Sequence, residues 1–244
     1  MATRLARAFG AFKIAVKKLR DHYERLISRS THEPQTHQRI LRVTFPYPDS
    51  YETELGGRVE FTYNRRFTPE KLIFVATTTT STKVLVKFTR RYSEEAHRFC
   101  ADAGVAPGLL GFRSLPGGWY MAVMEYMDTQ SYRVLGPGDY SNCVLVAEIQ
   151  RVVQVLHNRG FVHGDIRDVN MMTRHQWGTE EKAQNVLLLD FDWAGVKGVA
   201  KYPPNLNLQT VKRHKEATDG ALIMPGHDLV MVRKMFDTVV ITFV

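Results

Sequence analysis

The sequence predicts an α+β protein in which a small group of β-strands precedes most of the helices. Segments rich in branched and aromatic residues predict three strands, at residues 59–63, 71–78 and 83–88. Apolar residues at helical spacing follow at residues 93–103 and 143–156. With 244 residues, 44% of them hydrophobic, the chain is long enough to bury one sizeable core or two small lobes.

The first thirty residues predict a basic amphipathic helix. Apolar side chains recur there at alternating steps of four and three, the spacing of one continuous stripe on a helix. The stripe consists of Leu5, Phe9, Phe12, Val16, Leu19, Tyr23 and Leu26. Eight Lys and Arg residues stand against two acids, so this segment carries six of the net charge of +8. A polar, proline-bearing stretch at residues 28–38 predicts a linker, which makes residues 1–38 a helix-and-linker region.

The partner of this basic helix is left open by the sequence. Packing on its own domain or on a partner protein is the favoured interpretation. An anionic membrane surface or a mitochondrial presequence are the alternatives, because the first twenty residues contain no acid. Binding to nucleic acid is disfavoured.

Composition excludes several other classes. No apolar run approaches the roughly 18 residues that predict a membrane span. Cys100 and Cys143 are far apart and have no CxxC or His-rich companion, so the sequence indicates neither a zinc site nor a disulfide framework. A cytoplasmic setting is therefore expected, with mitochondrial and nuclear locations as open alternatives.

The remaining elements are predicted from local pattern. A Thr- and Ser-rich run at residues 77–82 lies between two strand patterns and predicts a hairpin turn. The helix predicted at residues 143–156 leads directly into a polar loop. A further apolar helical pattern begins at Asp228.

That polar loop, FVHGDIRDVN at residues 161–170, and the segment NVLLLDFDW at residues 185–193 carry the main functional signal. Asp165 and Asn170 are five residues apart, so a base and a metal ligand can converge from one turn. Four apolar residues precede Asp190, which predicts a buried strand that ends in a carboxylate. Phosphoryl transfer needs one carboxylate beside the acceptor hydroxyl, and a second carboxylate with an amide oxygen on Mg²⁺. The pattern therefore predicts a phosphoryl-transfer site that uses ATP and Mg²⁺.

The same residues resemble a known superfamily. LHNRGFVHGDIRDVN, residues 156–170, resembles the helix end and catalytic loop of eukaryotic-like kinases, with HGD as in aminoglycoside and choline kinases. DFD, residues 190–192, resembles the metal-binding DFG segment without its glycine. Stretches such as RRYSEEAH and DFDWAG are also similar to a group of fungal kinase-like proteins. The resemblance covers residues 59–236 and implies a bilobal protein-kinase-like fold. Its small antiparallel lobe and hinge would span residues 39–127, and a mainly helical large lobe residues 128–244.

The resemblance also implies roles for residues of the small lobe. VLVK ends at Lys87 and resembles the third-strand lysine motif, which implies that Lys87 binds the nucleotide phosphates. VMEYM resembles a gatekeeper and hinge, which implies Met124 as gatekeeper and adenine binding by the backbone of Glu125 and Met127. Glu95 is the implied ion-pair partner of Lys87, because the similar fungal sequences have a glutamate two residues before a histidine.

Other polar residues of the large lobe have implied roles too. Arg167 stands where protein kinases have a lysine near the transferred phosphate, and a guanidinium there could stabilise developing charge. A salt bridge from Arg167 to Asp168 or to another carboxylate is an equal alternative. Asp192 is a second metal ligand or a pairing residue. Asp228 resembles the buried aspartate that hydrogen-bonds the catalytic-loop backbone, and His163 would position that loop.

Three departures from the kinase pattern widen the range of functions. RRFTPEK, residues 65–71, has no glycine with which to bring backbone amides close to phosphate. KYPPNLN stands where an APE motif is expected. Only 16 residues follow Asp228, so the predicted large lobe is minimal or truncated. The predicted function is an ATP-dependent phosphotransferase with an unknown protein or small-molecule acceptor. A pseudokinase, a nucleotide-binding scaffold and a chance match are the alternatives.

Overall fold

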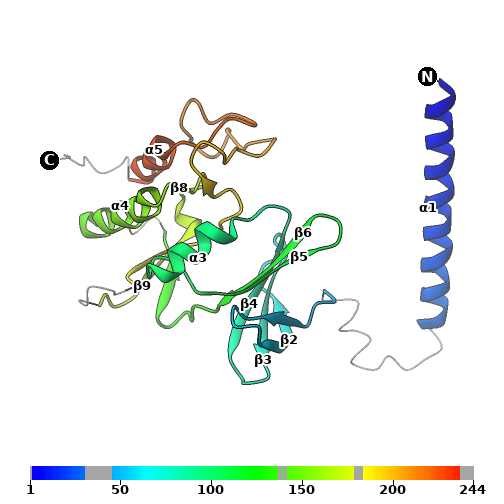
Figure 1. Ribbon diagram of the computed structural model, residues 1–244, viewed down its shortest axis with the longest axis horizontal. Coiled ribbons are helices and arrows are strands. Elements are labelled where there is room, and N and C mark those ends of the chain that lie inside the picture. Colours follow the sequence, from blue (N-terminus) through cyan, green and yellow to red (C-terminus); the bar gives the residue numbers. More distant parts are fainter. Residues whose placement is uncertain (1, 31–45, 137–138, 140–141, 179–183, 237–244) are drawn as a thin grey trace. The chain divides into compact units, whose positions relative to one another are not determined.

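A computed structural model of the protein describes residues 2–30, 46–136, 139, 142–178 and 184–236 (Figure 1). The chain divides into two compact units, residues 1–48 and 49–244. No helix among the described residues is both long enough and apolar enough to cross a membrane.

The first unit is built on helix α1 (Ala2–Ser30), which confirms the predicted N-terminal helix. Its described stripe side chains are exposed: Phe9, Phe12, Val16, Leu19 and Tyr23. The helix continues through Ser30, so the predicted linker does not begin at residue 28. The rest of that linker, residues 31–38, and the start of the predicted small lobe, residues 39–45, lie outside the described residues.

The second unit begins with a six-stranded antiparallel sheet in the order β1-β2-β3-β4-β6-β5. Its strands are β1 (Ser50–Glu52), β2 (Arg58–Arg66), β3 (Ile73–Thr78), β4 (Lys83–Thr89), β5 (Leu109–Leu115) and β6 (Trp119–Glu125). β2, β3 and β4 match the three predicted strands, and the Thr-rich run forms the predicted turn between β3 and β4, with Ser81 at φ 64°. β1, β5 and β6 were not predicted as strands.

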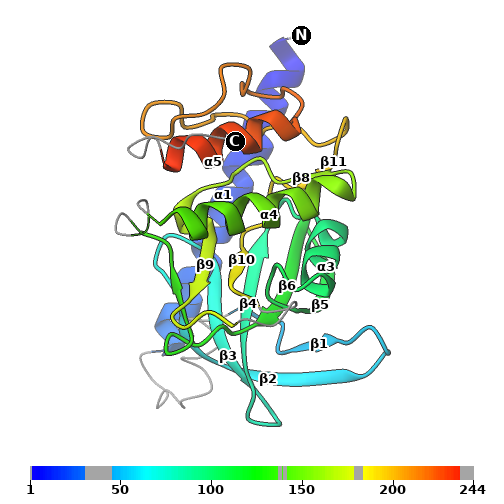
Figure 2. The ribbon, with the colours of Figure 1, turned by 90° about the vertical axis from the view of Figure 1, so that its left-hand side faces the viewer.

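Helix α3 (Glu94–Asp102) follows β4 and contacts β5, as Figure 2 shows. Ser93 caps its N-terminus by accepting a hydrogen bond from the Ala96 backbone N–H. The buried face carries Ala96, His97 and Cys100. The helix predicted at residues 93–103 is therefore confirmed.

The rest of the second unit is not mainly helical, so that part of the prediction is wrong for the described residues. Its described part contains helices α4 (Cys143–Asn158) and α5 (Pro225–Met235), the 3-10 turn η2 (Asp168–Asn170) and short strands. The strands are β7 (Tyr132–Val134), β8 (Phe161–Val162), β9 (Met171–Arg174), β10 (Val186–Leu188) and β11 (Gly195–Val196). They pair in the order β10-β9-β7 and as β11-β8. The described part between β11 and α5 contains neither helix nor strand, which leaves long irregular chain beside the site.

One apolar core fixes these elements around the predicted site. α4 buries Ile149, Val152 and Leu156 against side chains from α3, β10 and α5. α4 and α5 lie side by side (Figure 2). Leu156 lies near the end of α4, and Leu188 ends β10. The polar loops that follow these two elements therefore start from buried positions in the core.

Candidate active site

Asp228 holds the polar loop after β8 in place. Its Oδ2 accepts a hydrogen bond from the His163 backbone N–H (2.9 Å) and its Oδ1 accepts one from the Gly164 N–H (2.8 Å). His157 Nε2 lies 3.0 Å from Oδ2, and Asp228 itself is fully buried. Gly164 has φ 80°, and a Cβ there would come within 2.7 Å of Ile223, so the position requires glycine. The predicted structural role of Asp228 is confirmed.

His163 joins the loop to the exit of β10. Its Nε2 lies 3.0 Å from the Leu189 carbonyl oxygen, which can only accept, so Nε2 carries the ring proton. Nδ1 then accepts a hydrogen bond from the Asp165 backbone N–H (3.2 Å). The Leu189 N–H donates to the Asn170 carbonyl (2.8 Å). These bonds bring the segment that carries Asp190 beside the loop that carries Asp165, and they confirm that His163 positions the loop.

Both carboxylate oxygens of Asp165 are hydrogen-bonded to arginine. Oδ1 accepts from Arg213 Nη2 (2.7 Å), and Oδ2 accepts from Arg167 Nη2 (2.7 Å) and from Asn170 Nδ2 (2.8 Å). Asn170 Nδ2 also donates to the Asp165 carbonyl (2.9 Å). The structure therefore brings three predicted site residues together. The carboxylate alternative for Arg167 is realised, with Asp165 itself as the partner.

Arg213 belongs to the site but was not predicted. Its guanidinium lies 4.7 Å above the Trp193 ring, and Nη1 donates to the Gly164 carbonyl (3.2 Å). Its own carbonyl accepts a hydrogen bond from Lys234 Nζ (2.7 Å), which ties this segment to α5. The Nε atoms of Arg213 and Arg167 are buried without a hydrogen-bond partner. The only sequence signal was the basic run KRHK at residues 212–215, which by itself does not indicate a buried arginine.

Asp190 lies between two lysines, one from the sheet and one from a loop that joins two of its strands. Its Oδ1 is 2.6 Å from Lys87 Nζ, on β4, and its Oδ2 is 3.0 Å from Lys71 Nζ, on the loop between β2 and β3. Burial alone would raise the pKa of Asp190, but the two ammonium groups outweigh it and hold this pKa below its ordinary value. Asp190 has φ 63°, a conformation uncommon outside glycine. Lys71 was not predicted as a site residue.

Asp192 is the second acid beside Lys87. Its Oδ1 lies 2.6 Å from Lys87 Nζ but receives no hydrogen bond of adequate geometry. Burial raises the pKa of Asp192 above its ordinary value, against the attraction of the lysine. For Lys87, burial lowers the pKa, but the charges of Asp190 and Asp192 outweigh burial and raise it. Lys87, at 7% side-chain exposure, is thus held as a buried cation between two acids.

The predicted ion pair between Lys87 and Glu95 is not formed in this structure. Glu95 is exposed on the first turn of α3, and Lys87 forms its ion pairs with Asp190 and Asp192. The reason is the orientation of α3 about its axis, which places His97 and not Glu95 on the buried face. His97 stacks on Phe191 at 4.5 Å, and its ring nitrogens lie 2.6 Å from Tyr92 Oη and 2.8 Å from the Pro107 carbonyl.

The predicted hinge follows β6. The Glu125 backbone N–H donates to the Gly108 carbonyl (2.9 Å), and the Glu125 carboxylate accepts from the Gly108 N–H (2.8 Å). Met124 and Met127 are half-buried on either side of it. Adenine binding by the backbone of Glu125 and Met127 stays a prediction.

The oxygen donors around Asp190 suit Mg²⁺, which prefers carboxylate and amide oxygens. Asp192 Oδ1 is buried and has Lys87 Nζ as its ion-pair partner at 2.6 Å, so a metal ion there would share this oxygen with the lysine. Asn170 donates both of its described side-chain hydrogen bonds through Nδ2, so its amide oxygen is not engaged in any of them. Asp190, Asp192 and Asn170 are therefore the residues that would hold the metal.

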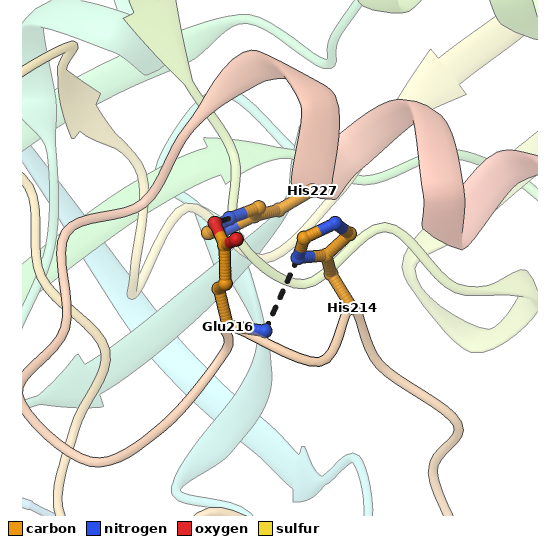
Figure 3. A group of neighbouring side chains, drawn as sticks. All are labelled: His214, Glu216 and His227. Carbon is orange, nitrogen blue, oxygen red and sulfur yellow. Dashed lines mark hydrogen bonds and ion pairs between the residues drawn. The ribbon is translucent and has the colours of Figure 1, made fainter.

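A second group of possible ligands, His214, Glu216 and His227, lies near the start of α5 (Figure 3). The two imidazoles stack at 4.6 Å. His214 Nδ1 accepts the Glu216 backbone N–H (3.2 Å), and His227 Nδ1 accepts the Met224 N–H (3.4 Å). Neutral rings bonded in this way carry their proton on Nε2, whereas a metal at Nε2 requires that proton on Nδ1. The group therefore fastens the irregular segment to α5 and carries no indication of a metal site.

Comparison with known proteins supports the fold. The structure of the Cydia pomonella granulovirus kinase PK-1 is similar with a TM-score of 0.52 and 12% identity, over 73% of this chain and 69% of that one. Vaccinia related kinase 3 is similar with a TM-score of 0.54 and 13% identity, over 82% and 72%. No protein-family model and no curated protein matches the sequence. At this identity the likeness concerns architecture alone, and it shows that the chain has a protein-kinase-like fold with an antiparallel sheet in its N-terminal lobe.

Proposed function

We propose that this protein is an ATP-dependent phosphotransferase. The observation that carries the proposal is the convergence of Asp165, Asn170 and Asp190 on one region of the chain. The hydrogen bond from the Leu189 N–H to the Asn170 carbonyl links the segments that carry them. Lys87 reaches Asp190 from the sheet. A carboxylate for the acceptor, oxygen ligands for a metal and a cation for phosphate are the groups that phosphoryl transfer requires.

In this proposal Asp165 orients or deprotonates the acceptor hydroxyl. Its carboxylate already accepts three hydrogen bonds, and release of one guanidinium would make room for the hydroxyl. Arg167 is the candidate, because it is 31% exposed whereas Arg213 is 3% exposed. A released Arg167 would stand beside the reacting centre, where a guanidinium stabilises the charge that develops on the transferred phosphoryl group.

The nucleotide would lie between the sheet and the loops. Lys87 would bind its phosphates, and the backbone of Glu125 and Met127 its adenine. Asp190 and Asn170 would hold Mg²⁺, which supplies positive charge that neutralises the phosphates. Asp192 adds a further carboxylate oxygen to that set.

A pseudokinase or nucleotide-binding scaffold without turnover is the second candidate. The observation in its favour is that Asp165 is bound by two arginines and one asparagine, so its two oxygens already accept three hydrogen bonds. The loop between β2 and β3 also lacks the glycines that would bring backbone amides to phosphate.

Binding of Mg-ATP, measured by thermal shift and by calorimetry, tests the nucleotide site. A ligand at about 100 times its Kd adds roughly 2.7 kcal/mol of stability. We expect this gain in the wild type and its loss in Lys87→Ala and Asp190→Asn. Lys83→Ala and Asp102→Asn, exposed positions on β4 and α3, are the matched controls and should keep it. Wild-type protein that gains no stability at millimolar Mg-ATP would refute the proposal.

Turnover separates the two candidate functions. Transfer from γ-labelled ATP should be measured with a panel of peptides and with a panel of small alcohols and amino alcohols, which also addresses the class of acceptor. The phosphotransferase proposal predicts labelled product that Asp165→Asn abolishes while Mg-ATP binding is retained. Binding without any turnover would favour the scaffold.

A further inference from the structure

The loop between β2 and β3, residues 67–72, occupies the place where a kinase-like fold covers the nucleotide phosphates. It contains no glycine, so it cannot bring a row of backbone amides close to phosphate. It does contain Lys71, and the side chain of this lysine is directed at the candidate metal site. The loop therefore offers a side-chain cation in place of backbone donors.

Lys71 and Lys87 converge on one carboxylate from different parts of the sheet. Lys71 Nζ is 3.0 Å from Asp190 Oδ2, and Lys87 Nζ is 2.6 Å from Asp190 Oδ1. The contact of Lys71 spans 119 residues of sequence. Lys87 is shared between two acids, whereas Lys71 contacts Asp190. Asp192, the other acid in the group, contacts Lys87.

The two lysines differ in burial. The Lys71 side chain is 51% exposed and that of Lys87 is 7% exposed. Lys71 can therefore turn away from Asp190 into solvent or toward a ligand at small cost, and Asp190 would still be paired with Lys87. Lys87 cannot leave without burying an uncompensated charge.

The backbone of the loop is arranged to present Lys71. The Lys71 carbonyl accepts a hydrogen bond from Arg66 Nε (3.0 Å), and the Lys71 N–H donates to Thr68 Oγ1 (3.3 Å). The Phe67 N–H donates to the Ile73 carbonyl (2.7 Å), which closes the turn. These bonds fix the backbone of Lys71, which lowers the entropy lost when its side chain binds an anion.

We propose that Lys71 is a phosphate-binding residue, which replaces the amides of a glycine-rich loop with one ammonium group. This inference rests on the proposed nucleotide site. In the absence of nucleotide Lys71 pairs with Asp190, and with nucleotide it contacts a phosphate of the polyphosphate chain. The ligand class that it recognises is the polyphosphate and not the nucleoside.

Calorimetric titration of the full chain in the presence of Mg²⁺ tests this, with ATP, inorganic tripolyphosphate and adenosine as three separate probes. Lys71→Ala should weaken ATP and tripolyphosphate by about 10- to 100-fold, the effect of one hydrogen bond between charged groups. Adenosine binding should not change. Lys71→Arg keeps the charge and should retain most of the affinity. Glu70→Ala, an exposed neighbour on the same loop, is the control that removes a side chain without removing the ammonium.

The possible failures are distinguishable. Wild-type protein that binds none of the three probes would overturn the proposed nucleotide site and this inference with it. Wild-type protein that binds ATP with an affinity that Lys71→Ala leaves intact would overturn the inference alone. Equal weakening of adenosine and ATP in Lys71→Ala would also overturn it, because it would show that the substitution disturbs the fold of the loop.

Discussion

Asp190 and Asp165 are both neutralised by two basic side chains, but the bases differ in kind and in burial. Asp190 is paired with lysines, of which Lys71 is half-exposed. Asp165 is paired with arginines, of which Arg213 is 3% exposed and lies against Trp193. An ammonium is a compact charge on a flexible stem, whereas a guanidinium is a planar fork that binds in one direction. Lys71, beside Asp190, is therefore suited to exchange partners, whereas Arg213 is suited to hold Asp165 in one geometry.

This difference separates two tasks. A nucleotide must enter and leave, so the groups that meet its phosphates need partners that they can give up. The carboxylate that faces the acceptor hydroxyl must keep its direction, so a buried arginine that donates to both Asp165 and the Gly164 carbonyl is useful beside it.

The largest effect is expected from Arg213→Ala. The substitution removes a bond to Asp165 and one to the Gly164 carbonyl, and it leaves a cavity beside Trp193. Loss of one partner of a buried ion pair costs about 3–5 kcal/mol, and the remaining bond to Arg167 places the expected loss near the lower end. Urea unfolding measures it.

Lys212→Ala is the control for this substitution, because Lys212 is the exposed neighbour of Arg213. It should change the free energy of unfolding by less than about 0.5 kcal/mol. A loss in Arg213→Ala no larger than that of the control would mean that Arg213 does not fix the geometry of Asp165. Arg213 would then be as exchangeable as Lys71.

The sequence predicted the fold where local pattern and final structure agree. β2, β3 and β4 are rich in branched residues, and α3 and α4 have clear apolar faces, so each was found. The segment at residues 197–224 has no such periodicity, and its structure comes from contacts with α5 such as the one from Lys234 to Arg213. The helices expected in this half of the unit came from the resemblance to kinases and not from the local pattern of these residues.

The site residues also divide into those that local sequence pattern could predict and those that it could not. Asp165 and Asn170 are near one another in sequence, and Asp190 follows a buried strand, so their grouping could be predicted. Arg213 reaches Asp165 across 48 residues, and Lys71 reaches Asp190 across 119. Such contacts depend on how the elements pack against one another. The spacing of residues along a single sequence does not give that information. Glu95 failed for the opposite reason, because a shift of two residues along α3 moves a side chain to another face of the helix.

The second largest effect is a pH dependence of folding stability that comes from His97. This residue stacks on Phe191, which stands between Asp190 and Asp192 in the sequence. Burial lowers the pKa of His97 from 6.5 to about 4, against its hydrogen bond to the Pro107 carbonyl. The unfolded chain therefore binds more protons than the folded chain between about pH 4 and 6.5. Stability from this residue is fully present above pH 6.5 and is lost as the pH falls toward 4. The loss is roughly 3 kcal/mol, since one unit corresponds to about 1.4 kcal/mol.

Unfolding by urea at pH 7, 6, 5 and 4.5 measures this dependence, with His97→Gln as the comparison. The variant should be less stable at pH 7 but should lose less stability on acidification. His22, which lies on α1, provides the matched control, and His22→Gln should follow the wild-type curve. Parallel curves for wild type and His97→Gln would contradict the assignment and would place the acid sensitivity elsewhere.

The smallest effect is expected from Lys71→Ala without nucleotide, and it is the sharpest test of the comparison. Half-exposed ion pairs contribute about 0–1 kcal/mol, and Asp190 keeps Lys87 after Lys71 is removed. We therefore expect less than about 1 kcal/mol of lost stability, and less still in 0.5 M salt, which screens exposed charges. Lys87→Ala in the same unfolding assay should lose clearly more, because it leaves Asp190 and Asp192 buried without their shared cation. Equal losses in the two variants would mean that Lys71 is as fixed as Lys87, and Asp190 would then have no exchangeable partner.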